Sequence, residues 1–503
     1  MKKFISFFII IFLFVNGCVE KKVSNNKIKR ESNSIIYGTI KNTTTLNMFD
    51  DSQQKDEELQ QALFDGLVKK DSRGNIIPSL AEKFENNKDH TVYKFKIRNN
   101  AKWSNGEEIT AEDFKVFFSQ IMAKDFINSF DYELFCIFGL ENYRKGLKDF
   151  SNVAIKDLDK HTLEIRLNYP CSYFLDIISN PRYSLRDIND NLYQWEKNFK
   201  NIKFSGAYKI LQINNKNIVL KKNDNYWGKA QVYNDIIEVT KYNNSEELMA
   251  AFKAQKIDIF KDPLINEISR LINNNEIYQQ EINYTKALIF NSKRSNLADL
   301  RFKKDINQSI DRKKICTDVL NSTAIPIEVK YKEDAKTGSL ERRDYSNKKI
   351  TLIYLNNSED KRVCEKIALD LKKIKNFNVE LLGCSNDEFN KKLNKNNYDM
   401  ALVELKKDSS REYYLNKYSS KNPLNICNFR SLEYDALLYK AKLEKDKSKK
   451  GNILNKCEEI LKEEFPVLEL YKKKLYISKI KDVDLETNYY GDLLLDKIRF
   501  EQL

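Results

Sequence analysis

Residues 349–408 constrain the fold more than any other part of the chain, because strand and helix patterns alternate there. The predicted elements are, in order, a strand at 350–355, a helix opened by Ser358, a strand at 379–382, a short helix around Phe389 and Leu393, and a strand at 398–405. This β-α-β-α-β order predicts a parallel open sheet. Ligands bind beyond the carboxyl ends of such strands, so the loop 406–411 is a candidate ligand-binding loop.

The remaining periodic segments predict further strands and helices. Strands are expected at 35–40, 91–98, 162–167, 218–222 and 236–240, where apolar and polar residues alternate or apolar residues cluster. Helices are expected at 56–68 and 245–255. A third helix should open at Thr110, because Asp113 stands three residues later in a pattern close to a capping box.

The amino terminus indicates where the protein resides. Two lysines precede an apolar run at 4–15, which is shorter than the roughly 20 residues of a membrane-spanning helix and has the length of a signal-peptide core. The run ends in VNGC at 15–18, which resembles a bacterial lipobox, although Asn16 departs from the usual alanine or serine. We expect residues 1–17 to be a lipoprotein signal peptide and Cys18 to carry the lipid; the alternative is a chance cysteine after an ordinary signal peptide.

Composition excludes some classes of protein. Residues 18–34 are rich in Lys, Asn and Ser and predict a solvated tether. The whole chain has 503 residues, of which 41% are hydrophobic and 12% aromatic, so two or three globular domains are expected. The net charge of +14 comes from 87 basic and 73 acidic residues that alternate along the chain, which favours a solvated surface over a nucleic-acid-binding face.

The residues that usually carry catalysis are scarce. The chain has two histidines, His90 and His161, both in polar turns, and it lacks HExxH, GxSxG, P-loop and GxGxxG patterns. Seven cysteines remain after Cys18, an odd number without metal-binding spacing, and most should be buried free thiols. We therefore expect a binding protein without metal or cofactor, not an enzyme; an exported hydrolase remains the alternative.

Several stretches resemble a known family. They are LFDGLV at 63–68 with NIIPSLAE at 75–82, YKFKIRNNAKWSNG at 93–106 with ITAEDF at 109–114, and SGAY at 205–208 with KNDNYW at 222–227. Shorter matches are FKAQKID at 252–258, IFN at 289–291, SIDRK at 309–313, YDMA at 398–401 and EYD at 433–435. In order and spacing these resemble the extracellular solute-binding proteins of family 5, the oligopeptide-binding type, over nearly the whole mature chain.

The resemblance implies an α/β, two-lobed periplasmic-binding-protein fold: two lobes with mixed sheets are joined by a hinge, and a small α+β subdomain is inserted in lobe one. Lobe one would combine residues 35–60, 184–280 and 480–503. The small subdomain would be residues 61–183, and lobe two residues 281–479. The ligand would be enclosed between the lobes when the hinge closes.

The resemblance also implies a function. The chain would be the substrate-binding component of an ABC importer, a monomeric, extracytoplasmic lipoprotein anchored to the membrane. It would capture short peptides through their backbone and termini and pass them to the permease and ATPase subunits. Asp408 aligns with the acidic residue that meets the ligand's amino group in the peptide binders, and it is the one binding residue carried over.

Two positions depart from the peptide binders. Leu402 stands where an arginine is common, and Leu405 stands where an aromatic residue is common. Lys406 or Arg411 would be the replacement for the lost cation. Other ligands known in the family therefore stay open: glycans, opines, metal chelates and haem. The turn positions of both histidines disfavour metal and haem, and Trp103 and Trp227 lie in scaffold motifs, which disfavours glycans.

Overall fold

A computed structural model describes residues 33–500, except 51–54, 190–191, 295–296, 298, 329–344, 346–348 and 375–376. The predicted signal peptide, Cys18 and nearly all of the tether lie outside the described residues. In the part of the chain that is described, no helix is both long enough and apolar enough to cross a membrane.

One large sheet runs through the molecule. Its eleven described strands follow the order β15-β14-β16-β12-β17-β11-β1-β10-β9-β8, and β13 pairs with β17. The strands are β1 (Ser34–Thr39), β8 (Tyr208–Ile213), β9 (Asn217–Lys222), β10 (Ile236–Lys241), β11 (Ile259–Lys261), β12 (Ile277–Phe290), β13 (Ala324–Pro326), β14 (Ile350–Leu355), β15 (Val379–Cys384), β16 (Met400–Lys406) and β17 (Val467–Lys479). The resemblance implied mixed sheets in hinged lobes, and the structure shows that strands of both lobes belong to one sheet.

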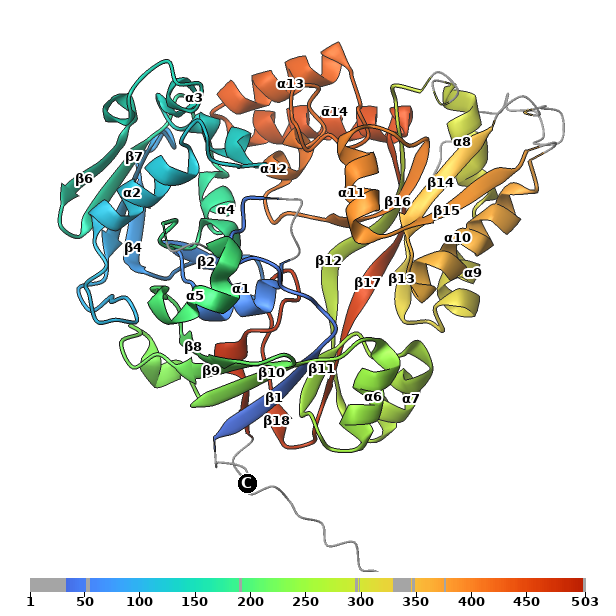
Figure 1. Cartoon of the computed structure of the whole chain (residues 1–503). Helices are drawn as coiled ribbons and strands as arrows, with labels where there is room; N and C mark the ends of the chain where they lie inside the picture. Colours follow the sequence, from blue (N-terminus) through green and yellow to red (C-terminus); the bar gives the residue numbers. More distant parts are fainter. Residues whose placement is uncertain are drawn as a thin grey trace, which may run out of the picture.

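The joint is made by the two longest strands, β12 and β17, which run side by side through the middle of Figure 1. One end of β17 pairs with β11, and the other end of β12 pairs with β16. Their mutual pairing shifts register between Glu281 and Thr285 and again between Lys286 and Ala287. Irregular pairing of this kind disrupts the ladder locally and bends the strand.

The β-α-β-α-β prediction for residues 349–408 is confirmed. Strands β14 and β15 are parallel, as are β14 and β16. Helix α10 (Ser358–Leu371) connects β14 to β15, and α11 (Asn386–Asn394) connects β15 to β16. One detail is corrected: the cap of α10 is Asn357, whose side chain accepts a hydrogen bond from the Asp360 amide, and Ser358 is the first helical residue.

A second, antiparallel sheet lies at the left of Figure 1. Its order is β4 (Ala81–Asn86), β5 (Val92–Ile97), β7 (Thr162–Arg166) and β6 (Ile155–Asp159). Helix α2 (Ala111–Ile121) packs on it and has the predicted capping box: Thr110 accepts from the Asp113 amide, and the Asp113 carboxylate accepts from the Thr110 amide. Nearby elements are β2 (Val68–Lys70), β3 (Ile76–Pro78), α3 (Leu140–Arg144) and α4 (Phe174–Ile178).

The helix predicted at 56–68 is shorter than expected. It forms α1 (Glu57–Leu63), with Asp56 as its cap, and the chain becomes extended at Phe64. The carbonyl of Leu63 accepts a hydrogen bond from the amide of Gly206, and a Cβ at Gly206 would lie 2.5 Å from the Leu63 carbonyl carbon. A segment about 140 residues away therefore ends the helix, which local periodicity does not reveal.

Buried side chains form several clusters, and we propose to divide the chain with the bounds given above, except that α1 runs past residue 60 and packs with lobe one. Lobe one contains β1, β8–β11, α1, α5 (Trp195–Asn198), α6 (Ser245–Lys253) and α7 (Ile268–Asn273), with β18 (Val483–Asp484) and β19 (Arg499–Phe500). Lobe two buries both faces of β14 and β16 under α8 (Leu300–Ser309), α9 (Arg312–Lys314), α10–α11, α12 (Arg411–Asn416), α13 (Leu432–Leu443) and α14 (Lys447–Glu464). Phe49 and Leu185, expected in lobe one, pack instead in the core of the small subdomain.

Candidate ligand-binding cleft between the lobes

A cavity of about 590 Å³ lies between lobe one and lobe two. Lobe one contributes Ile40, Ser245 and residues 262–268; lobe two contributes Lys286, residues 357–362 and Glu404; β17 contributes Tyr471, Lys473, Lys474 and Tyr476. The volume falls in the range of small-molecule and peptide pockets, roughly 300–1,000 Å³. Because both lobes and a connecting strand form its walls, the cavity changes shape if the lobes move.

Paired charges line the lobe-two wall of this cavity. Lys286 Nζ lies 2.7 Å from Asp360 Oδ1, and Lys473 Nζ lies 3.1 Å from Glu404 Oε2. Partial burial opposes ionisation of Glu404, but the charges of Lys473 and Lys286 outweigh it and lower the pKa of Glu404 to about 2. The wall is therefore charged at neutral pH and suits a polar ligand.

Strand β16 offers a backbone edge next to the cavity. It pairs with β12 as far as Lys406. On its other side, within the described residues, it pairs with β14 only at Met400 and Ala401. Residues Glu404–Lys406 therefore make no ladder pair on that side, and their backbone groups are suited to pair with an extended ligand.

The two candidate replacement cations lie in different places. Lys406 Nζ is 5.0 Å from the ring centre of Tyr284 and 5.6 Å from that of Tyr490, so it lies between the lobes. Arg411 contacts helix α14, where its Nε is 2.6 Å from Glu458. Leu402 is buried in the core of lobe two. Of the two cations, Lys406 is the one with ring contacts in both lobes.

Asp408 lies two residues beyond the end of β16, at the seam where lobe two meets the rest of the molecule. Its side chain is 6% exposed, and its Oδ2 lies 2.6 Å from Lys417 Nζ in the same lobe. Its Oδ1 accepts a hydrogen bond of 3.2 Å from the hydroxyl of Tyr490, which belongs to lobe one. The sequence-predicted acid thus has one partner on each side of the seam.

A second carboxylate–lysine pair flanks Tyr490. Lys70 Nζ lies 3.0 Å from Asp176 Oδ1 and donates a hydrogen bond of 3.2 Å to the Tyr490 hydroxyl. Asp176 also accepts a hydrogen bond of 2.6 Å from Ser409, the residue after Asp408. Two carboxylate–lysine pairs therefore flank one tyrosine at the seam, and Lys406 adds a third ammonium group beside its ring.

The seam continues through a buried carboxylate that the sequence did not single out. Glu133 of the small subdomain accepts hydrogen bonds from Tyr183 OH at 2.7 Å and from Tyr413 OH at 2.6 Å. Tyr413 comes from α12 of lobe two, is 8% exposed, and stacks on Tyr173 with ring centres 5.5 Å apart. A lobe-two side chain thus completes the core of the subdomain, so the lobes are closed on each other in this structure.

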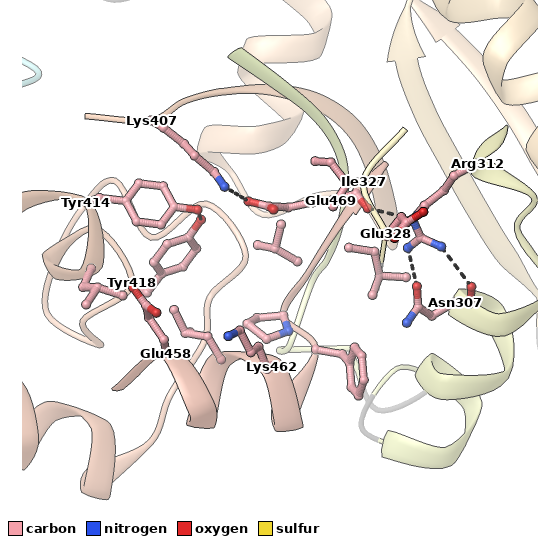
Figure 2. Close-up of a pocket in the computed structure, with 16 residues that line it drawn as sticks. Asn307, Arg312, Ile327, Glu328, Lys407, Tyr414, Tyr418, Glu458, Lys462 and Glu469 are labelled. Carbon is pink, nitrogen blue, oxygen red and sulfur yellow. Dashed lines mark hydrogen bonds and ion pairs between the residues drawn. The ribbon is translucent and has the colours of Figure 1, made fainter. Parts of the chain in front are cut away.

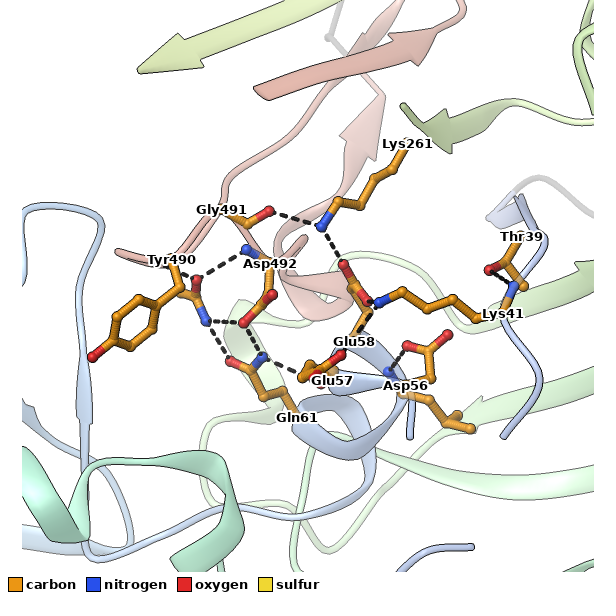
Figure 3. Close-up of polar contacts among 12 residues, drawn as sticks. Thr39, Lys41, Asp56, Glu57, Glu58, Gln61, Lys261, Tyr490, Gly491 and Asp492 are labelled. Atoms are coloured by element: carbon orange, nitrogen blue, oxygen red, sulfur yellow. Dashed lines mark hydrogen bonds and ion pairs between the residues drawn. The ribbon is translucent and has the colours of Figure 1, made fainter. Parts of the chain in front are cut away.

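A different charged cluster lies within lobe one (Figure 3). Glu58, at the start of α1, is fully buried and lies 2.7 Å from Lys41 Nζ and 2.6 Å from Lys261 Nζ. Burial opposes ionisation of Glu58, but the two lysines outweigh it and hold its pKa well below the usual range. All three residues belong to lobe one, so this cluster fixes α1 and does not span the seam.

The cavity in Figure 2, of about 630 Å³, is a weaker candidate for the ligand site. All of its lining residues belong to lobe two, between α12, α14 and the start of β17. Its polar groups already pair with one another: Lys407 with Glu469 at 2.8 Å, and Arg312 with the Glu469 carbonyl at 2.9 Å. Lobe closure does not form this cavity, whereas it does form the one between the lobes.

Two observations on the described residues bear on metal and glycan ligands. Among the described residues, no three His, Cys, Asp or Glu side chains are arranged to hold a metal ion. Trp103 is 3% exposed and donates to Asp113 at 3.3 Å, while Trp227 donates to Asp65 at 3.0 Å. Both tryptophans are structural, as predicted.

Comparison with known proteins supports this architecture. The chain is 26% identical over 446 residues to the oligopeptide-binding protein OppA of Bacillus subtilis, covering 81% of this chain and 82% of that protein. It is 25% identical to the periplasmic oligopeptide-binding protein OppA of Salmonella typhimurium, covering 83% and 82% of the two chains.

Solved structures share the fold. The murein tripeptide binding protein MppA of Escherichia coli superposes with a TM-score of 0.80 at 20% identity, covering 94% of this chain and 99% of that chain. Its unliganded open form gives a lower TM-score of 0.70. An oligopeptide-binding protein of Borrelia burgdorferi gives 0.80 at 24% identity, covering 93% and 100%.

One family describes the middle of the chain. The family described as "Bacterial extracellular solute-binding proteins, family 5 Middle" matches residues 75–329, about half of the sequence. This stretch contains the motifs at 93–114 and 205–227 on which the resemblance was first based. The two-lobed α/β fold, the cavity between the lobes and the family match agree: the chain belongs to the bacterial extracellular solute-binding proteins of family 5, which bind solutes and are not enzymes.

Proposed function

We propose that this protein captures short peptides between its two lobes and delivers them to the membrane permease of an ABC importer. The observation that carries the proposal is the cavity of about 590 Å³ between the lobes, which lies beside the uncovered edge of β16. Relatives named oligopeptide-binding, dipeptide-binding and murein peptide-binding proteins support a peptide as the ligand.

Recognition of the peptide backbone would use β16. An extended peptide presents donors and acceptors at a regular spacing, and Glu404–Lys406 offer matching groups on one side. Pairing of this kind gains affinity without reading side chains, so many peptide sequences are tolerated. From Asp408 back to Glu404 an extended chain covers about 13 Å, at roughly 3.3 Å per residue, so a peptide of about four residues reaches from the seam into the cavity.

Asp408 would bind the amino end of the peptide. Its carboxylate is nearly buried, and a charge-assisted hydrogen bond in such a place contributes about 1.5–3 kcal/mol. Lys417 already lies 2.6 Å from one carboxylate oxygen. The ligand's ammonium group therefore either shares Asp408 with Lys417 or displaces it, and the empty site is kept charge-balanced by the protein's own lysine.

The carboxylate end of the peptide would lie toward the cavity. Lys474 and Arg362 both line it, and neither makes an ion pair with another described residue. The other two lysines of the wall, Lys286 and Lys473, are paired with Asp360 and Glu404. We propose Lys474 and Arg362 as the cations that receive the ligand carboxylate, with Lys406 near the middle of the peptide.

Attachment to the membrane would be through Cys18, which lies outside the described residues. A diacylated cysteine holds a protein firmly, whereas one acyl chain binds only marginally. Mass spectrometry of the membrane fraction should find the mature chain starting at Cys18 with lipid attached. A Cys18→Ser protein that stays with the membrane as fully as wild type would contradict the anchor.

Calorimetry with defined peptides tests the binding function. Peptides of three to five residues with free termini should bind in a one-to-one ratio, and the same peptides should be recovered intact after prolonged incubation. Native mass spectrometry of the purified protein should show bound masses that fragment as peptides. Cleaved peptides would favour an exported hydrolase, and a bound glycan, opine or haem mass would overturn the peptide assignment.

Scattering tests the closing movement. Small-angle scattering of the ligand-stripped protein should give a larger radius of gyration than the same protein with saturating peptide, because the lobes separate when the seam opens. An identical profile in both states would argue that the lobes do not move on binding.

A further inference from the structure

Two cysteines lie together in the core of the small subdomain. Cys136 is 3% exposed and Cys171 is fully buried. The segments that carry them are joined by a backbone hydrogen bond of 2.7 Å from the Asn168 amide to the Cys136 carbonyl and by an isolated bridge between Ile137 and Leu167. The local backbone therefore holds the two segments side by side.

Both cysteine side chains belong to the same buried cluster of the small subdomain. Burial raises the pKa of the Cys171 thiol, and a hydrogen bond with the Cys136 side chain raises it further. The other five cysteines of the described chain, Cys316, Cys364, Cys384, Cys427 and Cys457, all belong to lobe two. All seven are buried, as the sequence predicted, and the structure records them as free thiols.

We propose that Cys136 and Cys171 form a disulfide in the exported protein. The sulfur–sulfur bond forms when the two thiols give up two electrons and two protons to a disulfide-bearing oxidant, which is itself reduced to two thiols. The extracellular setting of the family supplies the oxidising compartment in which such bonds persist. The remaining five thiols stay reduced.

Burial sets when the bond forms. The thiolate is the reactive species, and a raised pKa makes it scarce once the subdomain core has closed. The bond should therefore form while the chain folds outside the cell. For the same reason it should resist mild reductants in the native protein and become reducible only when the subdomain unfolds.

The bond would link the two segments of the small subdomain that contact lobe two. Cys136 ends the short 3-10 helix Asp131–Cys136, which carries Glu133, the acceptor of the Tyr413 hydroxyl. Cys171 directly precedes Ser172, which donates to Glu412 at 3.0 Å, and Tyr173, which stacks on Tyr413. The disulfide would therefore fix to each other the two segments that contact helix α12, and this link would not depend on the position of lobe two.

Peptide mapping tests the bond directly. Protein secreted by its host is unfolded in acid, its free thiols are alkylated, and it is digested with trypsin without reductant. The expected result is a linked pair of the peptides 125–144 and 167–182, two hydrogen atoms lighter than their sum, which separates on reduction. Recovery of both peptides with alkylated cysteines, or a link from either to a lobe-two cysteine, would overturn the proposal.

Thermal unfolding gives a second readout. Reductant present during the scan should lower the melting temperature of the wild-type protein by several degrees, because the released segment gains freedom in the unfolded chain. The Cys136→Ala/Cys171→Ala variant should show no reductant-dependent shift, even if its own melting temperature is lower. The matched Cys427→Ala/Cys457→Ala variant should keep the shift. A shift that persists without Cys136 and Cys171 would contradict the assignment.

Discussion

Two buried carboxylates, Glu58 and Asp408, look alike by burial and charge but belong to different regions of the molecule. Glu58 is fully buried between Lys41 and Lys261, and all three lie in lobe one. Asp408 is nearly buried against Lys417 in lobe two and against the Tyr490 hydroxyl in lobe one. The first set of contacts survives any movement of the lobes. In the second set the ion pair with Lys417 also survives, but the hydrogen bond from Tyr490 is broken when the lobes separate.

The difference separates a structural role from a binding role. A carboxylate whose partners share its lobe contributes to the free energy of unfolding. A carboxylate whose partners lie on both sides of a moving seam contributes to the equilibrium between open and closed states, and a ligand can act on that equilibrium only through contacts that differ between the states. Mutations in the two regions should therefore change different measured quantities.

The largest effect is expected at Glu58. Glu58→Gln leaves Lys41 and Lys261 without their buried counter-charge and should lower the free energy of unfolding by about 2–3 kcal/mol, below the range for fully buried pairs because Lys41 is 36% exposed. Glu57→Gln is the matched control: it pairs with the same Lys41 at 3.3 Å but is 35% exposed, so its loss should stay under about 1 kcal/mol.

Urea unfolding measures the free energy of unfolding of both variants. Calorimetry on the folded protein, below its unfolding transition, measures their affinity for peptide. Both variants should bind peptide as wild type does. If fully folded Glu58→Gln protein bound peptide more weakly than wild type, the lobe-one cluster would reach the ligand. That result would contradict the assignment of a purely structural role to Glu58.

The next largest effect concerns Asp408. Asp408→Asn removes the charge that would hold the ligand ammonium and should weaken binding of a free-amino peptide roughly tenfold to a hundredfold. An N-acetylated peptide should bind wild type poorly and lose little more in the variant. Calorimetry with both peptides decides the matter. If the variant binds the free-amino peptide as tightly as wild type, Asp408 is only a partner of Lys417.

A smaller effect is expected from the two tyrosines that donate to Glu133. Tyr413→Phe removes the hydrogen bond from lobe two and should weaken peptide binding about tenfold, with little change in unfolding of the open protein. Tyr183→Phe removes the equivalent bond from within the small subdomain and should lower stability without changing affinity. Equal effects of both variants on affinity would show that the hydrogen bond across the seam contributes no more to peptide binding than the one within the small subdomain.

The smallest effect is expected at Lys417, and it has the opposite sign. Lys417→Met leaves Asp408 without its own cation in the empty closed state, so the ligand ammonium supplies more of the stabilisation. Affinity for a free-amino peptide should rise by less than about tenfold, while affinity for the acetylated peptide should fall or stay level. A parallel change for both peptides in titration calorimetry would exclude competition between Lys417 and the ligand.

Short-range patterns predicted much of the fold correctly. The capping box at Thr110 and Asp113 and the strands and helices between 350 and 406 formed as expected, because periodicity and capping depend on residues a few positions apart. The helix at 56–68 was predicted too long, since Gly206 ends it from a distant part of the chain. The joining of both lobes into one sheet was also missed, because strand order is not encoded in the pattern of any single strand.

The candidate site was predicted less completely. Family resemblance selected Asp408, but nothing near it in the sequence pointed to Tyr490, 82 residues away, or to the pairing of Glu133 with Tyr413, 280 residues apart. The choice between Lys406 and Arg411 also needed the structure. In a strand followed by a loop and a helix, neighbouring residues point to different surfaces, and only packing shows which surface faces the cleft.

The sequence by itself determined the family, the α/β class, and most of the local elements, because these depend on motifs and on hydrophobic periodicity. Only the tertiary structure decided which charges meet: Glu58 with two lysines inside one lobe, and Asp408 with partners on both sides of the seam. The physical reason is that a charged residue gains little from its sequence neighbours in water, whereas its free energy in the folded protein depends on burial and on the few atoms that packing brings within 3 Å or so.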